Sequence, residues 1–146
     1  MREILFRAKA INRDKGYHRT NYKNGDWVYG LLTRMYDERF ETLPAEMANE
    51  GGVNGIEIDH NTIGQYTGLT AKNRKIFEGD IVKFGDIIGI INYNFGCFCV
   101  KTNKPDWKSR TNPAIDIVFN EYPNEVEIIG NIHDNPELLK GGADNG

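Results

Sequence analysis

The sequence lacks long apolar runs and holds few cysteines. No apolar stretch approaches the roughly 20 residues that a helix needs to cross a bilayer. Residues 1–7 also lack the apolar core of a secretory signal. Two cysteines cannot form a disulfide framework, which is typical of proteins in a reducing cytosol. These absences exclude a membrane-spanning protein, and we expect a soluble, cytoplasmic one.

Aromatic residues, by contrast, are plentiful. The chain has 146 residues, of which 16 are Phe, Tyr or Trp. Rings in this number supply core area and argue against a disordered chain. The length suits one ordinary domain or two lobes of about 70 residues each.

Basic charge is concentrated at the start of the chain. Residues 1–36 hold eight basic and three acidic groups, a net charge of +5, whereas residues 37–146 carry −8. Cations mixed with stacking rings are typical of nucleic-acid binding, which makes Arg7, Arg13, Arg19 and Trp27 candidate binding residues. The alternative is that opposite charges pair between two lobes while the rings form the core. The acidic pI of about 5.6 favours that alternative.

The pattern of the first half predicts strands. Residues 4–11 and 27–36 are apolar with alternation, so we expect two strands that pair with each other, and Asn24-Gly25 before the second strand is typical of a type I′ turn. Residues 37–54 are expected to be an irregular excursion or a mobile loop, in which Pro44–Ala48 can open a short helix.

Single turns and a linking segment follow. Residues 56–58 are expected to form a short strand, and Asp59 or Asn61 should cap one helical turn. Lys72–Lys75 and residues 78–80 are predicted turns.

The second half predicts a small barrel. Strands are expected over residues 81–84, 86–93, 95–100, 115–119 and 126–132, followed by a short helix over 135–140 and a frayed tail over 141–146. Short strands at this spacing are typical of an SH3-like barrel. The predicted fold class is therefore mainly β. It comprises an N-terminal β-rich lobe over residues 1–70, which includes the irregular excursion 37–54, and an SH3-like β-barrel over 71–140.

Candidate catalytic or metal-binding chemistry is sparse. Cys97 and Cys99 would project to one face of a strand, but a structural zinc site needs four ligands, so two packed core thiols are the simpler interpretation. His60 with Asp59, or His133 with Asp134, resembles a base and its orienting carboxylate. No nucleophile motif accompanies either pair. We therefore expect neither a catalytic site, nor a metal, nor a cofactor.

The segment Ile63–Val82 is the most distinctive part of the sequence. Its glycines and polar turns cost backbone entropy, so the segment must make several tight reversals. One interpretation is that it joins the two lobes and fixes their docking. The other is a ligand surface, built from the side chains of Gln65, Tyr66, Thr67, Lys72, Arg74 and Lys75.

This segment also resembles the signature block of the YopX family, small proteins of phages and prophages. Leu5–Arg7, Gly25–Gly30 and Val126–Leu139 are similar to other parts of the family pattern, so that the resemblance covers nearly the whole chain. Ala8 and Arg74 stand where the family usually has glycine. The resemblance implies a mainly β fold with an SH3-like C-terminal part, and it brings no established activity or catalytic residue.

The function predicted from these observations is a non-enzymatic binding or assembly module. Its partner would be a second copy of the chain or an unknown phage or host protein, because open sheet edges invite pairing with another chain. The alternative is a nucleic-acid-binding accessory protein that uses the basic N-terminal region. A third hypothesis, an enzyme, would place its site near Gln65, Tyr66 and His60.

Overall fold

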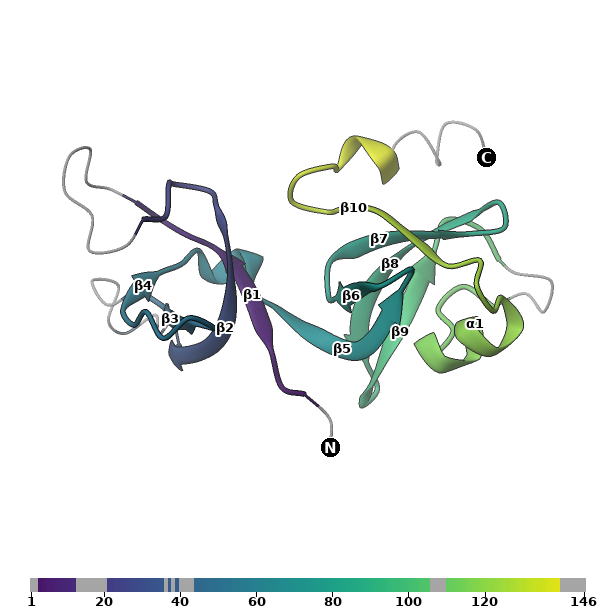
Figure 1. The fold of residues 1–146 in the computed structure, drawn as a ribbon. Coiled ribbons are helices and arrows are strands. Elements are labelled where there is room, and N and C mark those ends of the chain that lie inside the picture. The colour runs from purple at the N-terminus through teal and green to yellow at the C-terminus, as the bar shows by residue number, and fades with distance from the viewer. Residues whose placement is uncertain are drawn as a thin grey trace. The chain divides into compact units, whose positions relative to one another are not determined.

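The computed structural model describes residues 3–12, 21–35, 37, 39, 44–105 and 110–139. The strands are β1 (Phe6–Lys9), β2 (Trp27–Arg34), β3 (Glu46–Asn49), β4 (Ile56–Glu57), β5 (Gly64–Ala71), β6 (Arg74–Phe77), β7 (Asp80–Phe84), β8 (Ile87–Asn94), β9 (Cys97–Thr102) and β10 (Glu127–Asn131). The helical elements are η2 (His60–Thr62), α1 (Ile115–Glu121) and residues 137–139. The predicted mainly β class is confirmed (Figure 1).

The chain divides into two compact units, Met1–Tyr66 and Thr67–Gly146. The division falls inside β5, whereas the sequence suggested a boundary after residue 70. One antiparallel sheet has the strand order β4-β3-β2-β1-β5-β6, and the other has the order β10-β7-β8-β9. The finer expectation of an SH3-like barrel is not confirmed, because β5 and β6 belong to a different sheet from the four strands of the second unit.

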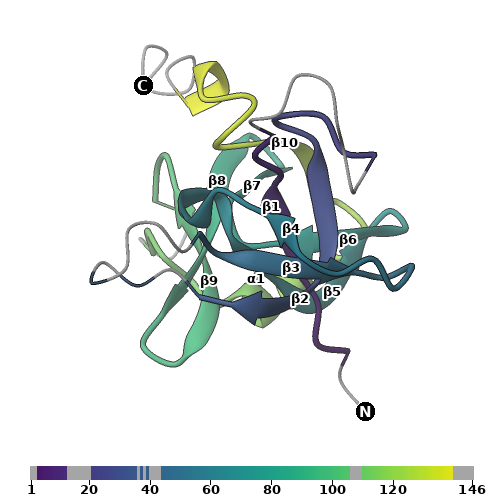
Figure 2. The ribbon, with the colours of Figure 1, turned by 90° about the vertical axis from the view of Figure 1, so that its left-hand side faces the viewer.

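The strands of the first unit close on themselves (Figure 2). β2 pairs with β1 as predicted, β3 pairs with β2, and β4 pairs with β3. The chain after β4 then returns to the end of β1, where Ala10 bridges Ile58 and the amide of Asp59 donates to the carbonyl of Lys9 at 2.9 Å. This closure therefore covers part of the outer edge of β4.

One face of these strands forms the core of the first unit. Its buried members are Ala8, Ala10, Val28, Ala45, Met47, Ile56 and Ile58. Met47 belongs to β3, so the short helix expected at Pro44–Ala48 is wrong, and so is an irregular course for this part of 37–54. Burial alternates from Ala45 to Ala48 with period two, which fits a strand and not a helix.

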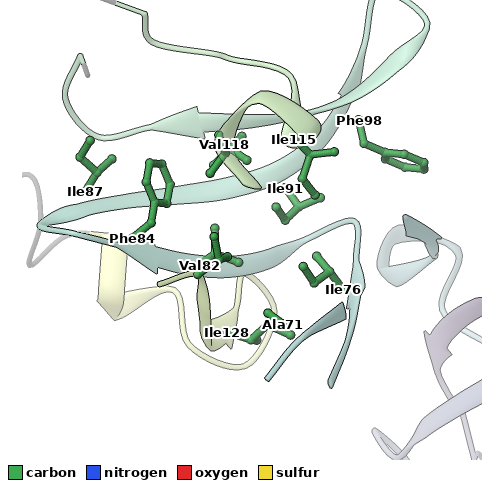
Figure 3. Close-up of a cluster of buried hydrophobic side chains, with 12 residues drawn as sticks. Ala71, Ile76, Val82, Phe84, Ile87, Ile91, Phe98, Ile115, Val118 and Ile128 are labelled. Carbon is green, nitrogen blue, oxygen red and sulfur yellow. The ribbon is translucent and has the colours of Figure 1, made fainter. Parts of the chain in front are cut away.

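The second unit has its own core (Figure 3). Val82 and Phe84 of β7 and Ile91 of β8 are almost fully buried. Figure 3 shows Ile115 and Val118 of α1 on the same cluster as these strand residues. The β-branched sequence of β7 and β8 predicted these strands, and their antiparallel pairing from Phe84↔Ile87 to Ile81↔Ile90 confirms them.

Residues 115–119 are helical, so the strand predicted there is wrong. The amide of Tyr122 donates to the carbonyl of Val118 at 2.9 Å, and Ile115 and Val118 are buried while Ile117 is exposed. A five-residue apolar pattern fits both a strand and one turn of helix, because positions i and i+3 share a helical face. Packing against the second core decides for the helix.

Two hairpin turns use left-handed backbone. Lys72 and Asn73 have φ of 49° and 68°, which is the pattern of a type I′ turn, so Arg74 begins β6 and is not part of the turn. Phe95 and Gly96 have φ of 51° and 79°, so they form the turn between β8 and β9 and not the start of the second strand. At Asn24-Gly25 only Gly25 has a positive φ, so the expected type I′ turn is wrong there.

Other local predictions are confirmed. Asp59 caps η2, and its Oδ1 accepts from the amide of Asn61 at 3.0 Å. β10 covers most of the predicted last strand, and residues 137–139 are helical within the predicted 135–140. The predicted tail over 141–146 lies outside the described residues.

Candidate functional site

The first surface that the sequence singled out contains a cation–aromatic cluster on β1 and β2. Lys9 pairs directly with Trp27 in the antiparallel register, and Arg7 pairs with Tyr29 two residues away. The guanidinium carbon of Arg7 lies 4.6 Å from the centre of the Trp27 ring, and the ammonium of Lys9 lies 5.5 Å from it. Such contacts stabilise a fold by about 0.5–2 kcal/mol each.

This cluster changes the expected role of Arg7 and Trp27. Arg7 is only 6% exposed, and Trp27 is half-buried and already holds two cations. A side chain that contacts phosphate must reach solvent, so Arg7 does not offer the predicted phosphate contact. Arg13 and Arg19, the other predicted cations, lie outside the described residues.

Gln65 and Tyr66 lie in the part of β5 that belongs to the first unit. Gln65 pairs with Phe6, and the amide of Tyr66 donates to the carbonyl of Leu5 at 2.8 Å. Gln65 is half-buried and Tyr66 is buried. Their backbones therefore attach β5 to β1.

Lys72, Arg74 and Lys75 lie in the other unit, at the β5–β6 hairpin. The ammonium of Lys72 lies 3.7 Å from a carboxylate oxygen of Glu127, and Arg74 donates to the carbonyl of Ile128 at 3.4 Å. Lys75 is exposed. The predicted ligand surface is thus divided between two units, and two of its cations contact β10.

A cavity of about 410 Å³ lies in the first unit. It is bounded by residues 3–5, by Gly30 and Leu31 of β2, and by residues 48–50. Gly30 is required at this point, because a Cβ there would overlap the carbonyl oxygen of Ala48. Gln65, Tyr66 and His60, where the enzyme hypothesis placed a site, do not line this cavity.

A second surface, which the sequence did not indicate, is the tip of the β8–β9 hairpin. Phe95 stands at the turn and is 96% exposed, and Tyr93 is 57% exposed. In Figure 1 the turn lies at the lower end of these two strands. We call Tyr93 to Cys97 the hairpin tip.

Over the residues that the structure describes, one edge of β8 has no partner strand at the hairpin tip. β7 pairs with β8 only from Ile87 to Ile90. Within the described residues, Asn92, Tyr93 and Asn94 pair with β9 alone. The ring of Tyr93 packs edge-on against Phe98 at 5.1 Å between centroids, and this contact supports the ribbon from one side.

Cys97 and Cys99 lie on the opposite side of the same hairpin. Their Sγ atoms are 3.5 Å apart, as expected for two thiols on one face of a strand. Cys97 is exposed and Cys99 is buried, so the interpretation of two packed core thiols holds for Cys99 only. Burial raises the pKa of Cys99 to about 11, with further contributions from Cys97 and Asp116.

The acidic neighbours of the histidines make local hydrogen bonds. Asp59 caps η2, and the carboxylate of Asp134 accepts from the side chain of Asn131 at 3.1 Å. No cluster of three or more His, Cys, Asp or Glu residues that could hold a metal ion occurs within the described part of the chain. None of the described helices has the length and apolarity needed to span a membrane.

The fold and these surfaces define a small, mainly β protein whose conspicuous exposed groups are aromatic rings on a hairpin. The family model described as YopX protein matches residues 7–140. The chain therefore belongs to the YopX family, as its sequence motifs indicated, and is a phage-type protein. No curated protein and no solved structure matches it.

Sequence reasoning missed the hairpin tip for a physical reason. Asn-Gly or Asp-Gly is the usual signal for a type I′ turn, whereas Phe95-Gly96 looks like apolar strand. The glycine after Phe95, between two β-rich runs, was the one available signal.

Proposed function

We propose that this YopX-family protein is a non-enzymatic binding module that docks a protein partner at the tip of its β8–β9 hairpin. The observation that carries the proposal is Phe95, an aromatic residue that is 96% exposed in a left-handed backbone conformation. The same surface can serve a second copy of the chain or a different protein, and the experiment below distinguishes the two.

Phe95 is costly at this position in the isolated chain. A residue other than glycine pays roughly 1–2 kcal/mol for left-handed backbone. Burial of a phenylalanine side chain yields about 1.5–3 kcal/mol, which this residue forgoes at the hairpin tip. A partner that covers the ring would supply the free energy of burying it, which supports a docking role over a purely structural one.

The edge of β8 supports the same role. Asn92, Tyr93 and Asn94 present backbone groups that pair on one side with β9. An extended segment of a partner can add to such an edge by main-chain hydrogen bonds, while Tyr93 and Phe95 provide apolar contacts. Both kinds of contact meet at the same three to four residues.

Binding of nucleic acid through the basic N-terminal region remains the alternative prediction. Arg7 is buried beside Trp27, and Arg13 and Arg19 lie outside the described residues. An electrophoretic mobility assay at about 50 mM salt tests it, because phosphate contacts are strongest at low salt. A shift that is lost when Arg13 and Arg19 are changed to Glu would favour this alternative.

Site-specific photocrosslinking tests the docking proposal directly. Benzoylphenylalanine is placed at position 95 of the full chain, and at position 101 as the matched control, since Lys101 is exposed at the far end of β9. Irradiation is performed on concentrated purified protein and on the cells that produce it. We expect a discrete adduct from position 95 that mass spectrometry identifies as a second copy or as another protein.

The photocrosslinked adduct should depend on the side chains of the hairpin tip. The additional change Tyr93→Ser should weaken it at least several-fold, while position 101 should give none. Light scattering after size exclusion provides the independent reading of self-association. Equal labelling from positions 95 and 101, or none from either sample, would contradict the proposal.

A further inference from the structure

The two thiols of β9 form a pair whose members differ in access. Their Sγ atoms lie 3.5 Å apart. Cys97 is exposed at the hairpin tip, whereas Cys99 is 5% exposed. The carbonyl of Asn94 lies 3.5 Å from the Sγ of Cys97 and 3.9 Å from that of Cys99, so both thiols converge on one acceptor.

We propose that Cys97 and Cys99 are a reversible dithiol–disulfide site that is oxidised by low-molecular-weight disulfides of the glutathione type. This site does not depend on the docking proposal, because it uses the thiols of Cys97 and Cys99 and neither of the rings of Tyr93 and Phe95. Packing accounts for Cys99 but not for Cys97, because a thiol that serves only as a small apolar group is usually buried, whereas Cys97 is exposed.

Access fixes the order of the reaction. An external disulfide can reach Cys97 but not Cys99. Burial and the neighbouring Cys97 also raise the pKa of Cys99 to about 11, so this thiol reacts slowly with reagents in solution. Cys97 is therefore the attacking thiol, and Cys99 is the resolving thiol.

The reaction has two exchange steps. The thiolate of Cys97, having lost its proton to water, attacks one sulfur of RSSR. A bond forms between Cys97 and that sulfur, and RS⁻ leaves and is protonated to RSH. Cys99 then loses its proton and attacks the sulfur of Cys97, which releases the second RSH. In total, two protein thiols and RSSR give one protein disulfide and two RSH, and two electrons pass to the reagent.

Strand geometry makes the disulfide reversible. Residues i and i+2 of a strand have Cα atoms about 6.6–6.8 Å apart, which is the upper end of the range of about 4.4–6.8 Å that disulfides span. The Cβ atoms of a disulfide lie about 3.5–4.5 Å apart, so closure requires β9 to depart from its extended conformation beside the turn. A disulfide formed at this cost is more easily reduced than a structural one.

Peptide mapping after oxidation tests the site. The full chain is incubated with glutathione disulfide, the remaining thiols are alkylated, and the protein is digested with trypsin. Both cysteines lie in the peptide Phe84–Lys101. We expect this peptide to lose two hydrogens and to take up no alkyl group, and dithiothreitol should restore both thiols.

Single-thiol variants distinguish the two roles. Cys99→Ser should stop at a stable glutathione adduct on Cys97. In Cys97→Ser, Cys99 should still be alkylated several-fold more slowly than a cysteine in the unfolded chain, because burial is the largest cause of its raised pKa and also limits its access to the reagent. Cys97→Ala and Cys99→Ala replace the Ser variants if circular dichroism shows that these do not fold.

Two results would overturn the proposal. One is a glutathione adduct on Cys97 that persists in the wild-type chain without ring closure. The other is oxidation that yields only disulfides between two chains.

Discussion

Arg7 and Trp27 form a cross-strand cation–π pair in which the guanidinium carbon lies 4.6 Å from the centre of the indole ring. The two residues belong to β1 and β2, and Lys9 approaches the same ring at 5.5 Å. Basic and aromatic residues near the start of the chain thus stabilise each other. A basic, aromatic-rich segment is not by itself evidence for a nucleic-acid surface.

The pair gives a first prediction. Arg7→Met keeps most of the apolar stem and removes the charge, so it should lower the free energy of unfolding by about 0.5–2 kcal/mol. Urea titration followed by circular dichroism measures the change. Lys23→Met serves as the control, because Lys23 is exposed and should change stability by less than about 0.5 kcal/mol.

Met47 gives a prediction for the first core. Its side chain is 0% exposed, so Met47→Ala should cost about 2–5 kcal/mol through lost burial and the cavity that remains. Leu31→Ala on the neighbouring strand is the matched control, because Leu31 is 53% exposed. Similar losses from both variants would contradict the assignment of β3 to the core.

The turn at Phe95 predicts a difference in stability between two variants. Phe95→Asn creates an Asn-Gly pair that accepts left-handed backbone, whereas Phe95→Ala keeps the strain and removes the ring. We expect the Asn variant to be more stable than the Ala variant by about 1 kcal/mol. Thermal unfolding compares the two, and both should lose the photocrosslinked partner when it is probed from position 93.

Asp80 ties the β6–β7 turn together. Its carboxylate is buried and accepts from the amide of Phe77 at 2.8 Å. Asp80→Ala should cost about 1.5–3 kcal/mol, because a hydrogen bond to a charged group is lost. Asp80→Asn keeps an acceptor oxygen and should cost less, and equal effects would show that this bond does not hold the turn. Denaturant titration measures both.

Cys99 predicts a loss of stability at alkaline pH. Its pKa is raised to about 11 from 9.0, mainly by burial. Above pH 9 the unfolded chain loses this proton while the folded chain keeps it, so the contribution is complete below pH 9 and disappears as the pH rises through 11. Urea titrations from pH 8 to 11 should show a shallower decline for Cys99→Ala than for the wild type. Cys97→Ala should show an intermediate slope, because it removes only the contribution of Cys97 to the pKa of Cys99, and identical slopes for Cys99→Ala and the wild type would contradict this cause.

Several elements could be predicted because their signals were local. A run of β-branched residues predicted the strand β8, and alternating apolar residues predicted the pairing of β1 with β2. The preference of aspartate for the N-cap position predicted that Asp59 caps a helical turn. Whether residues 115–119 form a helix or a strand depends on tertiary packing, because their apolar pattern fits the period of a helix and that of a strand. β3 was missed for the same reason, because the burial of Met47 depends on strands far away in the sequence.

The candidate site was predicted less well than the fold. Periodicity placed Cys97 and Cys99 on one face, but exposure, which distinguishes the two thiols, is a property of the folded hairpin. The prediction grouped Gln65 and Tyr66 with Lys72 and Arg74 because they are close in sequence, whereas the division inside β5 assigns them to different units. Phe95 escaped notice because the one sequence signal of its left-handed backbone is the glycine that follows it.

The course of β5 has a practical consequence for dissecting the protein. The chain passes from one unit to the next in the middle of a hydrogen-bonded strand, and no flexible linker is available there as a cutting point. A fragment ending at Tyr66 would keep the residues of β5 that pair with β1, but it would lose the rest of β5 and its partner strand β6. Truncation at this boundary should therefore leave strand edges unpaired, and both fragments should tend to aggregate.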